Sequence, residues 1–181
     1  MFGDKKKAAA AQAAAAAASS SSALWGYCDA AMPPLVTSPL RAILWCLALT
    51  FLPHFLRMPM VLKLKGRYNN LMPRSHQVSE KDTKEQPELV KMIQRATAAH
   101  ANSWEAFAYF SFSCLTAHVL KLDAQVASSL CTLFLVLRFA YVLLYIVGTS
   151  EWVGVLRSLV WVGALVAAVR MSVLALAQAG L

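Results

Sequence analysis

The residues best suited to chemistry lie in RATAAHANSWEAF, residues 95–107, which runs directly into the strongly apolar AYFSFSCLTAHVL. A helix turns by about 100° per residue, so Asn102 returns to within about 20° of Arg95, and Glu105 lies about 60° to one side. The three side chains therefore form one polar stripe on a helix that is otherwise apolar enough for a bilayer.

A second stripe of the same kind lies in RFAYVLLY, residues 138–145. Arg138, Tyr141 and Tyr145 recur at i, i+3 and i+7, which places them on a single helical face. A lone charge at the middle of a membrane helix costs about 2.5–3.5 kcal/mol, so Arg138 should turn inward and find a partner. Glu105 and Arg138 lie at nearly the same distance from the short turn at 121–123, roughly 24 Å along each helix. We therefore expect these two residues to form an ion pair.

The segment LRSLVW, residues 156–161, adds Arg157 on the same side of the membrane. Three arginines, Arg95, Arg138 and Arg157, would then face one glutamate, and the surplus positive charge favours an anionic ligand. The alternative is a structural role, in which these polar contacts only fix the register of the helices.

The elements that must position these residues are membrane helices. Of the 181 residues, 59% are hydrophobic, and the mean hydropathy is positive, which favours a membrane protein. A helix of about 20 apolar residues spans a bilayer, and the segments at about 40–62, 92–120, 124–147 and 153–178 meet this condition. The connections at 121–123 and 148–152 are short, so neighbouring helices should be antiparallel. The sequence predicts an all-α, multi-pass integral membrane four-helix bundle.

The net charge of +8 is concentrated between the first two predicted spans. Clustered Lys and Arg in a short loop typically mark the cytoplasmic or equivalent side, so this loop should face that side, with both termini opposite. Lys5, Lys6 and Lys7 favour the reverse orientation. The distribution indicates a lipid bilayer as partner and argues against nucleic acid, and it leaves the organelle open among endomembranes, mitochondria and plastids.

The amino-terminal residues differ in composition from the rest. Residues 1–38 begin with a low-complexity Ala- and Ser-rich run, which we interpret as a flexible arm or weak targeting segment leading to the membrane interface. Residues 39–181 form the predicted transmembrane domain. The four cysteines lack the spacing of a metal or redox motif, so we expect buried free thiols and no metal site.

Four segments together resemble one family of membrane proteins. GRYNNLMPR, RATAAHANSWEAF, RFAYVLLY and LRSLVW resemble, in order and spacing, the motifs of the membrane-associated proteins in eicosanoid and glutathione metabolism, the MAPEG family. The resemblance covers about residues 40–178 and is closest to the bacterial-type branch of that family.

This resemblance implies a homotrimer that binds glutathione as co-substrate between adjacent subunits, near the cytoplasmic side. It implies a glutathione-dependent transferase or peroxidase acting on a lipophilic small molecule, which enters laterally from the lipid. The fourth-helix Arg157 would stabilise the glutathione thiolate, because an adjacent guanidinium lowers the pKa of a thiol. The other residues that the resemblance assigns to glutathione binding are Arg95, Asn102, Glu105, Arg138, Tyr141 and Tyr145.

The chain also departs from the family pattern at several positions. Ala98 stands where eicosanoid-type members carry a further glutathione-binding arginine, and Tyr141 stands where prostaglandin-type members often carry histidine. The connection TSEWVGV is about three residues longer, which changes the register of Arg157. These departures keep open a non-catalytic accessory subunit of a larger membrane assembly. A channel or transporter is a third alternative, disfavoured because the sequence has no internal repeat and its polar groups cluster at one side.

Overall fold

The computed structural model describes residue 36, residues 38–66, residue 71 and residues 78–181. The secondary structure within these residues is entirely helical, which confirms the predicted all-α class. Most of the predicted amino-terminal arm and most of GRYNNLMPR lie outside the described residues. The helices are α2 (Pro39–Lys65), α3 (Glu80–Glu85), α4 (Pro87–Val119), α5 (Ala124–Val147) and α6 (Glu151–Ala179).

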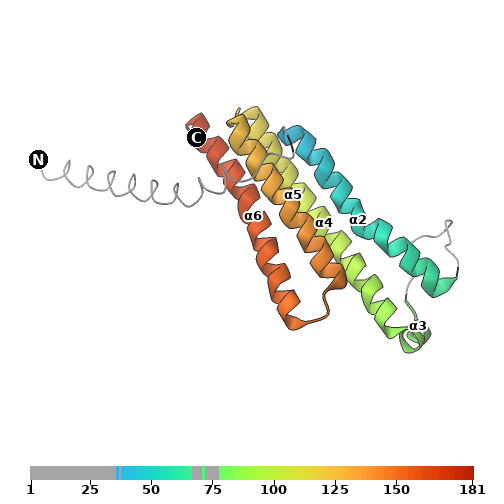
Figure 1. Ribbon diagram of the computed structural model, residues 1–181. Helices are drawn as coiled ribbons and strands as arrows, with labels where there is room; N and C mark the ends of the chain where they lie inside the picture. Colours follow the sequence, from blue (N-terminus) through green and yellow to red (C-terminus); the bar gives the residue numbers. More distant parts are fainter. Residues whose placement is uncertain (1–35, 37, 67–70, 72–77) are drawn as a thin grey trace, which may run out of the picture.

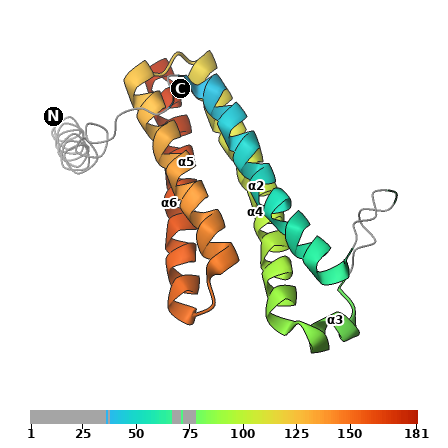
Figure 2. The same ribbon diagram turned by 45° about the vertical axis from the view of Figure 1, so that its right-hand side comes forward.

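The four long helices form two packed pairs. Helix α2 lies along α4, and α5 lies along α6 (Figure 1). The pairs come together at the end that holds the α4–α5 turn and diverge toward α3 (Figure 2). The divergent end is also where the polar stripes of α4 and α5 lie.

The helix ends follow from local sequence. Pro39 begins α2, where its missing N–H removes no helical hydrogen bond. Gly66 ends the same helix with φ at 70°, a left-handed conformation that a side chain would disfavour. Asp123 caps α5 by accepting hydrogen bonds from two backbone N–H groups, and the Ser150 hydroxyl caps α6 by accepting one from Val153.

Three of the helices are long and apolar enough to cross a membrane: α2, α5 and α6. They correspond to the predicted spans at 40–62, 124–147 and 153–178, and the chain is an integral membrane protein. Helix α4 is the longest, with 33 residues, but its polar stripe interrupts the apolar sequence. A fourth span, and with it the four-helix membrane bundle, remains a prediction.

The core lies where the two helical pairs converge. The rings of Phe110 and Phe134 stack there with centroids 3.8 Å apart and planes within 4°. Beside them, the Sγ atoms of Cys114 and Cys131 lie 3.8 Å apart. Cys46, Cys114 and Cys131 are all buried and free, as predicted.

A polar clasp joins the carboxyl end of α2 to the short helix α3. The Lys65 ammonium pairs with the Asp82 carboxylate, which also accepts hydrogen bonds from the backbone N–H and the hydroxyl of Ser79. The hydrogen bond from Lys65 and those from Ser79 hold the pKa of Asp82 well below its usual range. The clasp fixes the start of α4, because α3 leads directly into it.

Candidate functional site

The α5 stripe begins with a buried arginine. Arg138 is only 2% exposed. Its Nη2 donates hydrogen bonds to the carbonyl oxygen of Asn102, at 3.2 Å, and to the hydroxyl of Ser103, at 3.3 Å. Arg138 therefore turns inward as predicted, and its partners are neutral oxygens on α4.

The predicted ion pair between Glu105 and Arg138 is wrong. Glu105 is exposed, and among the described residues its carboxylate has neither an ion-pair nor a hydrogen-bond partner. Similar depth along two helices does not fix the rotation of each side chain about its helix axis, so it did not suffice to pair the two residues. Ser103, the residue after Asn102, is the side-chain partner of Arg138 in place of Glu105. The only sign of this role in the sequence was a second polar residue next to Asn102.

The stripe continues as a series of stacked groups. The Arg138 guanidinium carbon lies 4.3 Å from the centre of the Tyr141 ring. The Tyr141 and Tyr145 rings meet edge to face, with centroids 5.5 Å apart and an interplanar angle of 69°. The guanidinium carbon of Arg157, on α6, lies 4.3 Å from the centre of the Tyr145 ring. These contacts connect α4 to α6 through one face of α5.

A cavity of about 390 Å³ opens beside this series. It brings together four of the predicted site residues, one from α4, two from α5 and one from α6. Its lining consists of Asn102, Tyr141, Tyr145, Arg157, Ser158, Trp161 and Val162. The cavity is thus lined by a guanidinium, two phenols and an amide, together with apolar and indole surface. Such a lining suits a ligand with both polar and apolar parts.

A second cavity, of about 280 Å³, adjoins the amino-terminal end of α6. Arg157 lines both cavities, and Arg95 enters from α4. Arg95 is held in place because its Nε donates a hydrogen bond to the carbonyl oxygen of Ile146, at 3.0 Å. The positive ends of the backbone dipoles in the first turn of α6 also favour negative charge here, although Glu151 contributes one carboxylate to the lining.

A third cavity, of about 520 Å³, is also lined by Arg95. Lys63 and Glu88 line it together with the ends of α4 and α5. Sequence position alone does not connect Lys63 with Arg95. The link needs the tertiary arrangement, since α2 ends beside the start of α4.

The seven predicted residues therefore divide into groups. Asn102, Tyr141, Tyr145 and Arg157 line the first cavity, and Arg95 and Arg157 both line the second. Arg138 lies behind the tyrosines. Glu105 is apart from these cavities on the outer surface of α4.

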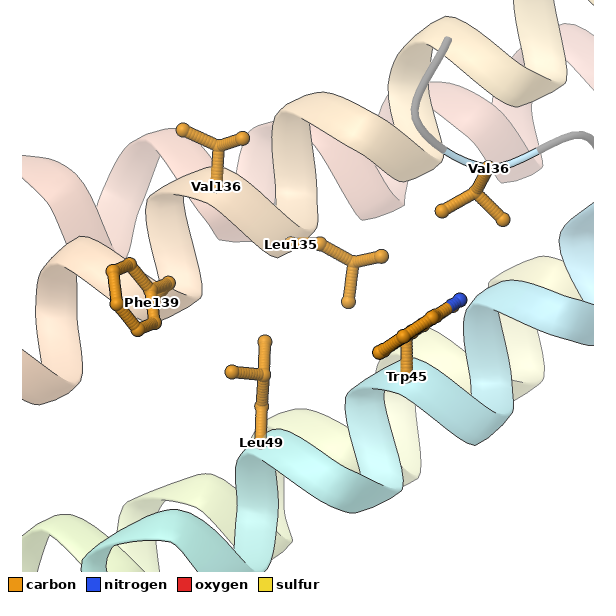
Figure 3. Close-up of a pocket in the computed structure, with 6 residues that line it drawn as sticks. All are labelled: Val36, Trp45, Leu49, Leu135, Val136 and Phe139. Atoms are coloured by element: carbon orange, nitrogen blue, oxygen red, sulfur yellow. The ribbon is translucent and has the colours of Figure 1, made fainter.

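A different kind of cavity lies between α2 and α5. It measures about 430 Å³ and is lined by Val36, Trp45, Leu49, Leu135, Val136 and Phe139 (Figure 3). Among the side chains that line it, only that of Trp45 has a polar atom, the indole nitrogen, and both helices are candidate membrane spans. Its lining suits hydrocarbon, and it offers no group for acid, base or ion chemistry.

The chain also matches a known protein family. A model of the MAPEG family matches residues 40–177. The chain belongs to the MAPEG family. The match runs from the start of α2 almost to the end of α6 and includes all seven predicted site residues of this MAPEG chain. No curated protein and no solved structure gives a match.

Proposed function

We propose that this MAPEG-family protein is a glutathione-dependent transferase or peroxidase that acts on a lipophilic electrophile at the membrane. The observation that carries the proposal is the position of Arg157, in the shared wall of two cavities that also hold Arg95, Asn102, Tyr141 and Tyr145. Two guanidinium groups in adjoining cavities suit a small acidic peptide, since a guanidinium binds carboxylates with paired hydrogen bonds.

Arg157 would act on the thiol of glutathione. A free thiol has a pKa of about 8.5, and a fixed positive charge beside the sulfur lowers it, so more thiolate is present at neutral pH. In a transferase, the thiolate forms a carbon–sulfur bond and the leaving group departs with its electron pair. In a peroxidase, the thiolate attacks the hydroperoxide to give an alcohol and a sulfenic acid. A second glutathione then converts the sulfenic acid into a disulfide and water.

A homotrimer with glutathione between protomers is part of the proposal. It is supported by the exposed carboxylate of Glu105, which the resemblance assigns to glutathione and which lies outside the cavities of its own protomer. In a trimer, Glu105 would complete the site from a neighbouring copy by accepting a hydrogen bond from the glutathione ammonium group.

The test uses the full chain, purified and reconstituted in lipid nanodiscs. We expect saturable glutathione binding by calorimetry and conjugation of the aryl halide 1-chloro-2,4-dinitrobenzene. Arg157→Ala should lower kcat by about 10²-fold, the usual effect of removing one group that stabilises developing or reacting charge. Lys81→Ala, which removes an exposed charge on α3, is the matched control. Absence of glutathione binding, or equal activity of Arg157→Ala and wild type, refutes the proposal.

A non-catalytic accessory subunit is the second candidate, favoured by Ala98 in place of a further arginine. Native electrophoresis of gently solubilised membranes separates the two. A species larger than a homotrimer, together with absent glutathione binding, supports the accessory role.

A further inference from the structure

Arg138 is a charged residue for which the binding site offers no direct use. The family resemblance assigns it to glutathione, but its side chain is buried and it lines none of the cavities that hold Arg95 or Arg157. Its Nη1 has no hydrogen-bond partner among the described residues. Burying a guanidinium group with an unpaired N–H opposes folding. The function of Arg138 should therefore lie in the groups that it contacts.

Its contacts form an unbroken series that ends at Arg157. Backbone and hydroxyl oxygens of α4 fix one edge of the Arg138 guanidinium. The same group lies over Tyr141, whose ring meets Tyr145 edge to face. Tyr145 in turn presents the face of its ring to Arg157. Each contact limits the freedom of the next group.

We propose that Arg138 is a positioning residue that acts through Tyr141 and Tyr145 to hold the Arg157 guanidinium at the cavity wall. The inference rests on the proposed function, because it assigns Arg157 the role of acting on a bound thiol. Arg138 itself touches neither ligand nor reacting atoms. Its planar group is essential to this role, since only a flat guanidinium can bind α4 oxygens along its edge and stack on a ring with its face.

The first test follows Arg157 directly and requires no activity. Phenylglyoxal modifies accessible guanidinium groups, and peptide mass spectrometry gives the rate at each arginine. Arg138→Met, Arg138→Lys and Tyr145→Leu should each raise the rate at Arg157 severalfold. Tyr145→Phe, which keeps the ring face, should leave it at the wild-type value. Arg95, anchored to Ile146 instead, is the internal control and should not change.

The second test measures how the change reaches the thiol. In Arg138→Lys and Tyr145→Leu, we expect the pKa of the bound glutathione thiol, from its ultraviolet thiolate absorbance, to rise. A displacement of about 1 Å can cost on the order of 10²-fold in rate, so kcat should fall steeply. In Arg138→Lys, the Kd of S-methylglutathione, which lacks an ionisable thiol, should stay within about twofold, a change of only ~0.4 kcal/mol.

The outcomes distinguish the possible failures. An unchanged phenylglyoxal rate at Arg157 in either Arg138→Lys or Tyr145→Leu overturns the positioning role, even if glutathione binds. In Arg138→Lys, much weaker binding of S-methylglutathione with an unchanged thiol pKa overturns the role too, because Arg138 would then contact the ligand. If the wild type binds no glutathione but Arg157 still responds, the proposed function fails and the mechanical link stands. Tyr145→Leu keeps the test valid if Arg138 variants do not fold.

Discussion

His100 donates its Nδ1–H to the carbonyl oxygen of Thr50, with 2.8 Å between nitrogen and oxygen, and so ties α4 to the middle of α2. The other ring nitrogen, Nε2, accepts a hydrogen bond from the Trp104 indole N–H at 3.2 Å. Pro53 lies three residues beyond Thr50 and disrupts the regular hydrogen bonding of α2. The carbonyl that loses its donor is that of Leu49, since Pro53 has no N–H, and the bond from His100 lies one residue away, at Thr50.

Replacing His100 with Leu should therefore destabilise the protein. The change removes both hydrogen bonds, and we expect a loss of about 1 kcal/mol in the free energy of unfolding, typical of polar contacts between membrane helices. Unfolding in mixed micelles at increasing denaturant provides the measurement. His118→Leu, at an exposed position of the same helix, is the control, and equal effects of the two substitutions would contradict the assigned role of His100.

The stacked rings of Phe110 and Phe134 should contribute strongly to the free energy of unfolding. Phe110→Ala removes a ring that is fully buried against Phe134, and large-to-small core changes of this kind cost about 3–5 kcal/mol. Phe112, on the same helix, is 68% exposed, so Phe112→Ala is the matched control and should cost far less, since lipid replaces its contacts. Thermal unfolding of both variants checks that Phe110→Ala lowers the melting temperature more than Phe112→Ala does.

Gly148 should resist any side chain because of its surroundings. A Cβ atom there would lie 2.4 Å from the carbonyl oxygen of Leu144 and 2.6 Å from a methyl carbon of Val153. Gly148→Ala must therefore move the α5–α6 connection, at a cost of about 1–3 kcal/mol, and displace Arg157, one to two turns into α6. We expect lower stability and lower kcat.

The control for this steric argument is Gly154, because a Cβ atom there would meet nothing within 4 Å. Gly154→Ala should stabilise α6 by about 0.5–1 kcal/mol through its helix propensity. If the two substitutions gave the same melting temperature, the close contact at Gly148 would not matter.

The clasp between α2 and α3 should weaken in acid. Because folding lowers the pKa of Asp82, its carboxylate stabilises the folded clasp at pH values above its unfolded pKa of about 3.9. That contribution disappears as the pH falls further, through the lowered pKa of the folded state.

Hydrogen exchange of the α3 amides tests this pH dependence. Asp82→Asn should exchange faster than wild type at pH 7, compared at equal pH, and the difference should narrow as the pH falls below about 4. Glu85→Gln, which breaks only the exposed pair with Lys81, should match wild type throughout. A difference between Asp82→Asn and wild type that persists undiminished in acid would rule out the carboxylate as its source.

Helical periodicity predicted what depends on one helix alone. The i, i+3, i+7 spacing placed Arg138, Tyr141 and Tyr145 on one face, and the structure stacks them there. Apolar length predicted α2, α5 and α6 as candidate spans. Side-chain contacts between helices were harder to predict, because two residues at the same depth in the membrane can still point in different directions around their helix axes. For that reason the predicted ion pair between Glu105 and Arg138 is wrong. The partners of Arg138 are the Ser103 hydroxyl and the Asn102 carbonyl oxygen.

Val155, Leu159 and Val162 are exposed on one face of α6, and Val162 also lines the cavity that holds Arg157. In the proposed reaction, glutathione would reach the site from water, and the lipophilic electrophile would reach it from the hydrocarbon interior of the bilayer. For the second, the effective concentration is its mole fraction in lipid, so an apparent KM expressed per litre should scale with the amount of membrane added. Expressed per mole of phospholipid, the same constant should stay fixed.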